Sequence, residues 1–205
     1  MIPVAPQPEP VEFAGTVRAP GIKWIRKSGL NPQEPVPSGT NLPPHWTKCL
    51  PALRSAYSGI CAYAGVFVPP VVGAPSVEHF LAKSERLDQA YEWVNYRFVC
   101  AKMNSRKRNF DDVLDPFTLE PEMFVLNLVN GGIMANSSLN ITKRQRVSKT
   151  IKRLNLDDAE CREMRLFYID GWLLNQRNRD DGVTLGQLKL HAPFVYLEMK
   201  RQNLL

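Results

Sequence analysis

The chain has 205 residues, of which 44% are hydrophobic, so it is long enough to bury a sizeable core. Its formal charge of +6 suits an anionic partner, and its apolar runs are broken by glycine and proline well short of the about 20 residues that span a bilayer. We therefore expect no membrane partner. Because the first residues lack the basic and apolar regions of a secretory signal, we also expect a cytoplasmic location.

The first region, residues 1–45, is rich in proline, which removes backbone donors and opposes both helix and central strand. The composition predicts an extended N-terminal arm. Residues 22–25 are mostly β-branched or aromatic, and two interpretations stay open for them. They either dock the arm on the body of the protein or belong to a loose tail.

The second region, residues 46–118, begins with helical spacing of apolar residues at 46–57. Two β-prone runs follow at 60–68 and 74–80, separated by prolines and a glycine, and together they predict a hairpin. His79 is then at the end of the second strand. The latter part of 91–109 predicts a helix, so this region should contain two strands, a loop and a helix.

The third region, residues 119–205, predicts a mainly helical extension. A short strand is expected at 123–129 and ends before Gly131, and a helix is expected over 138–154. Asp157 can cap a second helix that continues through 174 or beyond. Residues 188–197 fit helix or strand equally well. Together the three regions predict an α+β fold.

Three short motifs follow one another in the second region. Glu78-His79 ends the predicted strand, Trp93-x-Asn95 lies in the following loop, and Asn104-x-x-Lys107 lies on the predicted helix. A lone Glu-His pair is usually structural, but the combination in this order is specific. Over about residues 46–117 it resembles the HNH nuclease family, also called ββα-metal or His-Me finger nucleases.

The resemblance implies a ββα core that holds one divalent cation, Mg²⁺ or Mn²⁺, and hydrolyses phosphodiester bonds as a DNA endonuclease or nickase. It implies that Glu78 and Asn104 bind the metal, that His79 is the general base, and that Asn95 orients His79 or pins the loop. The chemistry agrees, because hard cations prefer oxygen ligands and an imidazole can be neutral near neutral pH.

Cations close to these motifs are expected to bind the phosphate backbone of DNA, with a solvated helix face as the alternative for each. They are Lys83, Lys102, Arg106, Lys107 and Arg108. A second basic stretch at 143–153 either extends this track or receives a partner protein. The aromatic residues around Asn95 are expected to be core rather than base-stacking platforms.

Many members of the resembled family hold a structural zinc with two Cys-x-x-Cys pairs. Here each pair retains one cysteine, Cys61 and Cys100, and two thiolates do not complete a tetrahedral site. We therefore expect no structural zinc.

Short motifs at 131–133, 150–151 and 154–156 resemble the tail of bacterial HNH proteins from anti-phage defence operons. This resemblance implies action against phage DNA together with a sensor or ATPase protein, as in Zorya or Septu systems. Two other functions stay open: a catalytically silent nucleic-acid-binding or scaffold subunit, and an RNase of the same fold. A further hypothesis is that the N-terminal arm covers the site and inhibits it until displaced.

Overall fold

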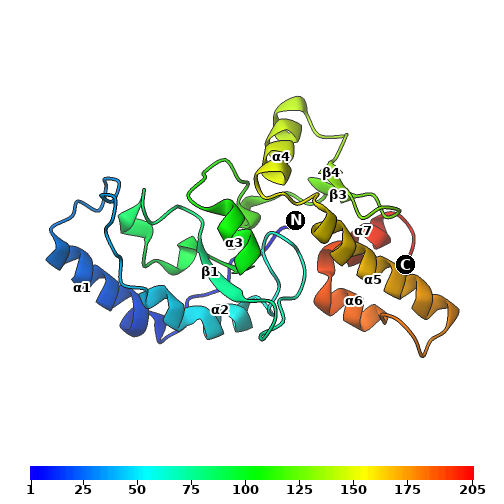
Figure 1. Cartoon of the computed structure of the whole chain (residues 1–205), viewed down its shortest axis with the longest axis horizontal. Coiled ribbons are helices and arrows are strands. Elements are labelled where there is room, and N and C mark those ends of the chain that lie inside the picture. Colours follow the sequence, from blue (N-terminus) through cyan, green and yellow to red (C-terminus); the bar gives the residue numbers. More distant parts are fainter. The chain divides into compact units, whose positions relative to one another are not determined.

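The computed structural model describes all residues from 1 to 205 and is a mixed α+β structure, as predicted (Figure 1). Its strands form two small antiparallel sheets. It contains two compact units. The N-terminal unit comprises Ala5–Gly59 and Val68–Asp111, and the C-terminal unit comprises Met1–Val4, Ile60–Phe67 and Asp112–Leu205. None of the helices combines the length and the apolar character that crossing a membrane requires.

The N-terminal unit opens with a helix where the sequence predicted an extended arm. A π-helical turn, Ala14–Arg18, continues directly into α1, Ala19–Ser28. Pro20 is tolerated because it lies in the first turn of α1, just after the wider π turn, where its missing N–H is not needed. The prediction of an extended conformation is therefore wrong for residues 14–28.

This opening helix packs through residues at four-residue spacing. Phe13, Val17 and Ile25 are buried, and the Phe13 ring meets the Trp93 ring edge-on at 5.5 Å between centroids. Gly21 completes the stripe, since a Cβ there would come within 2.1 Å of the Tyr91 ring. Docking, rather than a loose tail, is the interpretation that the structure supports.

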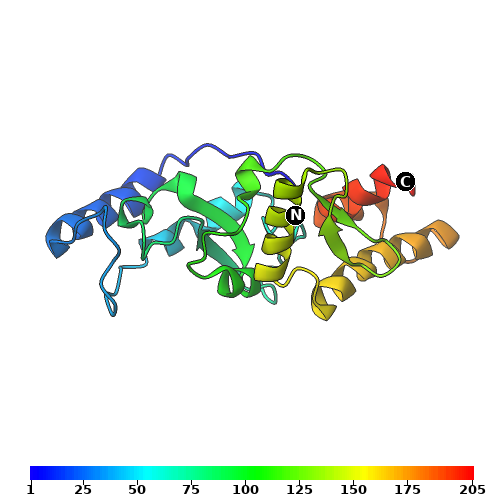
Figure 2. The same ribbon diagram turned by 90° about the horizontal axis from the view of Figure 1, so that it is seen from above.

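A short helix follows, formed by the 3-10 turn His45–Cys49 and α2, Leu50–Ala56, and this confirms the helix predicted at 46–57. The two strands of the unit are β1, Pro75–His79, and β2, Tyr96–Cys100. They pair antiparallel from Pro75 opposite Cys100 to His79 opposite Tyr96, and α3, Ala101–Lys107, follows β2 without a loop (Figure 2).

The strand that ends at His79 and the helix after residue 100 are thus confirmed, but the predicted partner of that strand is wrong. Residues 60–68 form only an isolated bridge between Ile60 and Phe67, and the partner strand is β2. The loop at 80–95 therefore joins the paired strands. It places the segment that contains Trp93 and Asn95 directly before β2.

The C-terminal unit contains a second strand pair and four helices. The strands β3, Phe124–Leu126, and β4, Ile133–Ala135, form a hairpin whose second strand was not predicted. The helices are α4, Ile141–Arg153, α5, Ala159–Arg177, α6, Leu185–His191, and α7, Pro193–Arg201. The predicted helices at 138–154 and from 157 onward are confirmed, and the undecided stretch 188–197 is helical.

Side chains at the helix starts of this unit satisfy backbone N–H groups that would otherwise lack partners. Asn140 caps α4, Asp158 caps α5, and Thr184 forms a capping box with Gln187 at the start of α6. The cap of α5 is thus one residue later than the predicted Asp157. Asp157 instead accepts a hydrogen bond from the backbone of Ile133, which ties the α4–α5 turn to β4.

Candidate functional site

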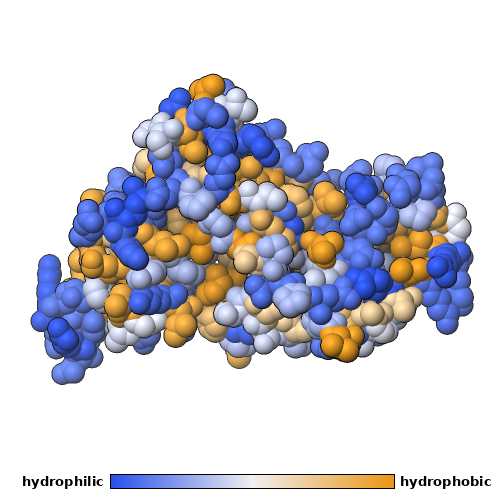
Figure 3. Space-filling model, turned by 180° about the vertical axis from the view of Figure 1, so that it is seen from behind, coloured by the Kyte–Doolittle hydropathy of each residue, from blue (hydrophilic) through white to orange (hydrophobic).

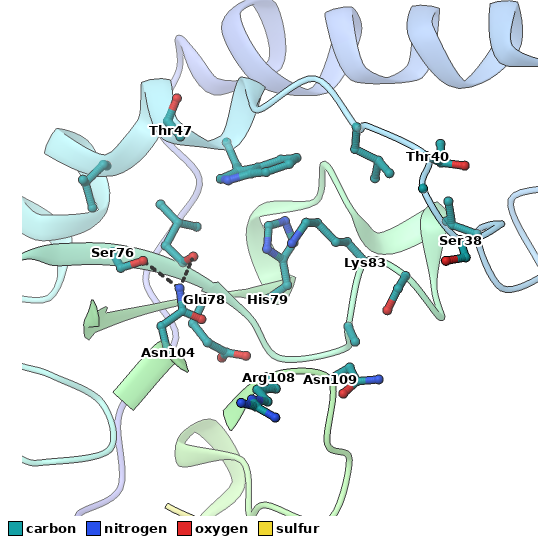
Figure 4. A pocket seen from close by; sticks show the side chains of 18 of the residues that line it. Ser38, Thr40, Thr47, Ser76, Glu78, His79, Lys83, Asn104, Arg108 and Asn109 are labelled. Carbon is teal, nitrogen blue, oxygen red and sulfur yellow. Dashed lines mark hydrogen bonds between the residues drawn. The ribbon is translucent and has the colours of Figure 1, made fainter. Parts of the chain in front are cut away.

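A cavity of about 540 Å³ lies within the N-terminal unit, at the end of β1 (Figure 4). Three parts of the unit line it: residues 36–50 on one side, β1 and the start of the following loop on another, and the last turn of α3 on the third. Among the predicted site residues it brings together Glu78, His79, Asn104, Lys83 and Arg108. Asn95 and the other cations do not line it.

The imidazole of His79 is held in one orientation. Its Nε2 lies 3.0 Å from the carbonyl oxygen of Ala90, which also accepts the Tyr96 hydroxyl at 2.8 Å. A carbonyl oxygen only accepts, so Nε2 carries the proton and Nδ1 holds the lone pair. The rings of Trp46 and Tyr96 meet the imidazole edge-on at 4.9 and 5.0 Å between centroids, which fixes its plane.

His79 is neutral at neutral pH. Burial of the ring is the largest cause that lowers its pKa, the positive charge of Lys83 adds to it, and together they bring the pKa to about 3. Lys83 itself lies beside the imidazole (Figure 4), and burial lowers its own pKa as well. The site is therefore electropositive and keeps an unprotonated imidazole.

Asn104 is oriented by two acceptors on β1. Its Nδ2 donates to the Ser76 hydroxyl at 2.7 Å and to the Val77 carbonyl at 3.4 Å (Figure 4). Because the Val77 carbonyl can only accept a hydrogen bond, the amide nitrogen of Asn104 must face it. The amide oxygen of Asn104 therefore points away from the Val77 carbonyl. Ser76 was not among the predicted site residues, since a serine two positions before Glu78 carries no signal by itself.

Glu78 forms a buried ion pair with Lys107. The Nζ atom of Lys107 lies 3.0 Å from Oε1 of Glu78, and both side chains are 1% exposed. The same ammonium group donates to the carbonyl oxygens of His79, at 3.1 Å, and Phe80. Lys107 thus clamps the end of β1 to the end of α3.

The prediction that Lys107 contacts a nucleic-acid phosphate is therefore wrong. A charged group is stable in an interior only when it is paired and hydrogen-bonded, and three partners on the β1 end supply that environment here. The sequence reveals the charge of a residue but not whether it points inward. The spacing from Asn104, one helical turn away, is the only feature that could have indicated an inward direction.

Asn95 pins the loop between the strands. Its Nδ2 donates to the carbonyl oxygens of Leu81 and Gln89, and its Oδ1 accepts from the backbone N–H of Leu81 at 2.7 Å. Of the two roles expected for Asn95, the structure shows the loop contact. Through its hydrogen bond to Gln89, the residue before Ala90, it also fixes the position of the Ala90 carbonyl that orients His79.

The remaining predicted cations differ in position. Lys83 and Arg108 line the cavity, whereas Lys102 and Arg106 lie on α3 outside it. Lys102 is exposed and Arg106 is half-buried. Lys83 and Arg108 are thus the cations placed to meet a ligand in the cavity.

The proline-rich segment contributes a wall of the cavity that sequence reasoning missed. Residues 36–40 and Leu42 line it, and Val36 N–H donates to the Ser84 carbonyl at 2.6 Å. The Tyr91 hydroxyl donates to the Pro43 carbonyl at 3.0 Å and holds the other end. Trp46 continues this wall, with Lys83 Nζ 5.1 Å from the centre of its ring.

The donor set of the cavity fits a hard divalent cation. Glu78 offers a carboxylate and Asn104 offers an amide oxygen, and both side chains line the same cavity. Mg²⁺ and Mn²⁺ bind oxygen ligands, and Mg²⁺ commonly takes only one or two protein groups while keeping several waters. No group of three or more His, Cys, Asp or Glu side chains is placed to hold a metal.

No protein-family model and no curated protein matches this chain. The case for a function therefore comes from the geometry of the cavity and from the motifs that line it. The residues from the Glu78-His79 and Asn104 motifs meet in the cavity, and Asn95 supports it from the loop.

Proposed function

We propose that the protein is a metal-dependent nuclease of the HNH type, which hydrolyses phosphodiester bonds of DNA. One observation carries this proposal: a strand end and the helix after its partner strand bring Glu78, His79 and Asn104 into one cavity with two cations. The antiparallel pair β1–β2 followed directly by α3 agrees with the ββα arrangement that the resemblance implies.

His79 supplies the base in this proposal. With Nε2 committed to the Ala90 carbonyl, Nδ1 is the atom that takes a proton from the attacking water. A phosphodiester in the cavity adds negative charge beside the ring, which raises the pKa of His79 from its low value in the free protein toward that of an effective base. The edge-on contacts of Trp46 and Tyr96 keep the ring aimed throughout.

Glu78 and Asn104 would hold the divalent cation, which would supply positive charge to neutralise the scissile phosphate and the leaving oxygen. Lys107 keeps the Glu78 carboxylate in place, and Ser76 keeps the Asn104 amide in place. Lys83 and Arg108 attract the phosphate into the cavity. Each of these side chains thus has a binding or orienting task.

A plasmid-nicking assay tests the proposal. Supercoiled DNA with Mg²⁺ or Mn²⁺ should be nicked by the wild type, and His79→Ala should lower the rate by about 10²- to 10⁴-fold, the usual contribution of a general base. His45→Ala is the matched control, because His45 lies beside Trp46 but does not line the cavity. Protein that binds DNA but never nicks it under these conditions would favour the silent nucleic-acid-binding subunit.

Cleavage of DNA and RNA substrates of matched sequence distinguishes a DNase from an RNase. The comparison is needed because the site chemistry acts on the phosphodiester and does not select the sugar. The proposal expects faster cleavage of DNA. If RNA is cleaved faster and the cleavage still depends on His79, the protein is an RNase that uses the proposed mechanism.

We also propose that this activity serves anti-phage defence together with a sensor or ATPase protein. The support is the resemblance of residues 131–133, 150–151 and 154–156 to the tail of defence-operon HNH proteins. Protection against phage should be lost with His79→Ala in the complete operon. Full protection by that strain would contradict the role in defence and would leave the nicking activity unaffected.

A further inference from the structure

The helix α4 of the C-terminal unit carries an unusual concentration of positive charge. Between Glu122 and Asp157 the chain has no acidic residue, and all six lysines and arginines of that stretch lie on α4. They are Lys143, Arg144, Arg146, Lys149, Lys152 and Arg153. The helix therefore has no internal partners for its cations.

Acidic residues elsewhere in the unit compensate only part of this charge. Lys143 pairs with Glu120 at 2.6 Å, while Arg153 and Lys149 approach Asp112 at 2.6 and 3.3 Å. Arg144, Arg146 and Lys152 are exposed and form none of the ion pairs of the unit. These three cations remain available to an anion outside the chain, and Lys149, whose side chain is 62% exposed, shares Asp112 with Arg153 and is only partly neutralised.

Three of the exposed cations, Arg144, Lys149 and Lys152, lie on the side of α4 that faces away from its packed side. Val147 and Thr150 are buried and fix the inner side, whereas Arg144, Ser148 and Lys152 follow one another at four-residue spacing on the outer side. Figure 3 shows mainly hydrophilic side chains around the helix at the top of the view, with a few apolar ones between them. This outer side, with Lys149, is the basic face of α4, and Arg146 lies on the flank next to the buried Val147 and Thr150.

The chemistry of the basic face selects a nucleic-acid backbone over other anionic partners. A protein interface usually centres on several buried aromatic or aliphatic anchors, whereas the basic face offers arginine, lysine, glutamine, serine and threonine side chains and one exposed aliphatic residue, Ile141, at the start of the helix. An anionic membrane requires an apolar side for insertion, which the inner residues of α4 do not offer because they are packed within the unit. A phosphate backbone requires only cations and hydroxyl donors.

We infer that the basic face of α4 is a docking surface for the phosphate backbone of nucleic acid, located in a different unit from the cavity. With 13 residues the helix is about 20 Å long, enough to follow several successive phosphates. The inference rests on the proposed nuclease function and extends it by adding a second surface that binds the same class of substrate. Such contacts position nucleic acid without reading its sequence.

Binding measured without cleavage tests this inference. Fluorescently labelled duplex DNA is titrated with the full chain in EDTA at several salt concentrations, and Arg144→Glu/Lys152→Glu is compared with Arg177→Glu/Lys200→Glu. The control pair changes the net charge equally and lies on exposed positions of α5 and α7. Arg144→Gln/Lys152→Gln, a milder pair, guards against misfolding by the double reversal.

Arg144→Glu/Lys152→Glu should weaken binding about tenfold or more. It should also make the negative slope of log K against log salt shallower by about 1.8, which corresponds to two lost phosphate contacts. The control pair should leave the slope unchanged. Equal effects of both pairs, or an unchanged slope for the α4 pair, would overturn the inference. A lost interaction with an acidic protein but not with DNA would assign the face to a protein partner instead.

The outcome is separable from that of the nuclease proposal, because binding in EDTA needs no catalysis. If the protein binds DNA through α4 but does not nick it, the nuclease proposal fails and the docking surface stands. If the variant Arg144→Glu/Lys152→Glu cleaves DNA at the wild-type rate at low DNA concentration, the docking surface is ruled out and the nuclease proposal stands.

Discussion

The interior of the N-terminal unit and the basic face of α4 both concentrate charged side chains, but in opposite environments. Around β1, Glu78 and Lys107 are each 1% exposed and are paired with one another. On α4 most of the cations are exposed, and only some of them are paired. Buried charges that lose a partner are expensive and therefore fix geometry, whereas exposed charges contribute little to stability and instead attract ligands.

The largest expected effect comes from breaking the buried pair. Lys107→Met should lower the free energy of unfolding by about 3 to 5 kcal/mol, because Glu78 keeps its charge in the interior without its partner. Lys152→Met, on the basic face, is the matched control and should change stability by less than about 0.5 kcal/mol. Urea denaturation followed by circular dichroism measures both.

A double variant separates the pair from simple loss of packing. Lys107→Met/Glu78→Gln should be less destabilised than the sum of the two single changes, since neither partner is then left charged and alone. Additive losses would show that the ion pair does not couple these residues. The distinction between buried and exposed charges would then not hold for this site.

An intermediate effect is expected where the opening helix meets the core of the N-terminal unit. Val17 is fully buried, so Val17→Ala should destabilise the protein by about 2 kcal/mol through lost apolar burial and the cavity that remains. Val11, which is 97% exposed, provides the control Val11→Ala with no measurable change. Equal stability of both variants would mean that the opening helix is not part of the folded core.

The smallest effect is expected from the partly exposed ion pair beside α4. The Arg153 guanidinium holds the pKa of Asp112 below its ordinary value of 3.8, so the pair stabilises the folded state above that pH. Asp112→Asn should therefore cost about 1 kcal/mol at neutral pH. This difference should shrink as the pH falls through the folded-state pKa, where the carboxylate of the wild type takes up its proton.

Denaturation of the wild type and Asp112→Asn at pH 7, 5 and 3 measures that dependence. A difference that stays constant down to pH 3 would attribute the loss to packing rather than to charge. Because Asp112 is the acidic partner of both Arg153 and Lys149, the variant also frees two cations of α4. DNA binding in EDTA should therefore be as strong or stronger in this variant.

Local patterns in the sequence predicted much of this architecture. The end of β1 at His79, the helices α3, α4 and α5, and the buried aromatic residues near Asn95 depend on residues close together in the chain. The partner of β1 was predicted wrongly, because proline and glycine at 69–73 resemble a hairpin turn. The actual partner lies beyond a long loop, and only the tertiary fold selects it.

The sequence indicated only part of the lining of the cavity, for a similar reason. Motif spacing identified Glu78, His79 and Asn104, which line the cavity, but the wall at residues 36–42 is distant in sequence and has no motif. Proline content also concealed the apolar stripe at 13, 17, 21 and 25, which has helical spacing. Lys107 was misjudged because composition does not reveal the direction of a side chain.

The wall formed by residues 36–42 has a consequence for ligand binding. The wall contains no helix or strand, but proline restricts its backbone before it at Pro32 and Pro35, within it at Pro37, and after it at Pro43 and Pro44. Such a segment has few alternative conformations to give up when a ligand arrives. The cavity is thus largely preorganised, and more of the energy of each contact goes into affinity than into ordering the chain.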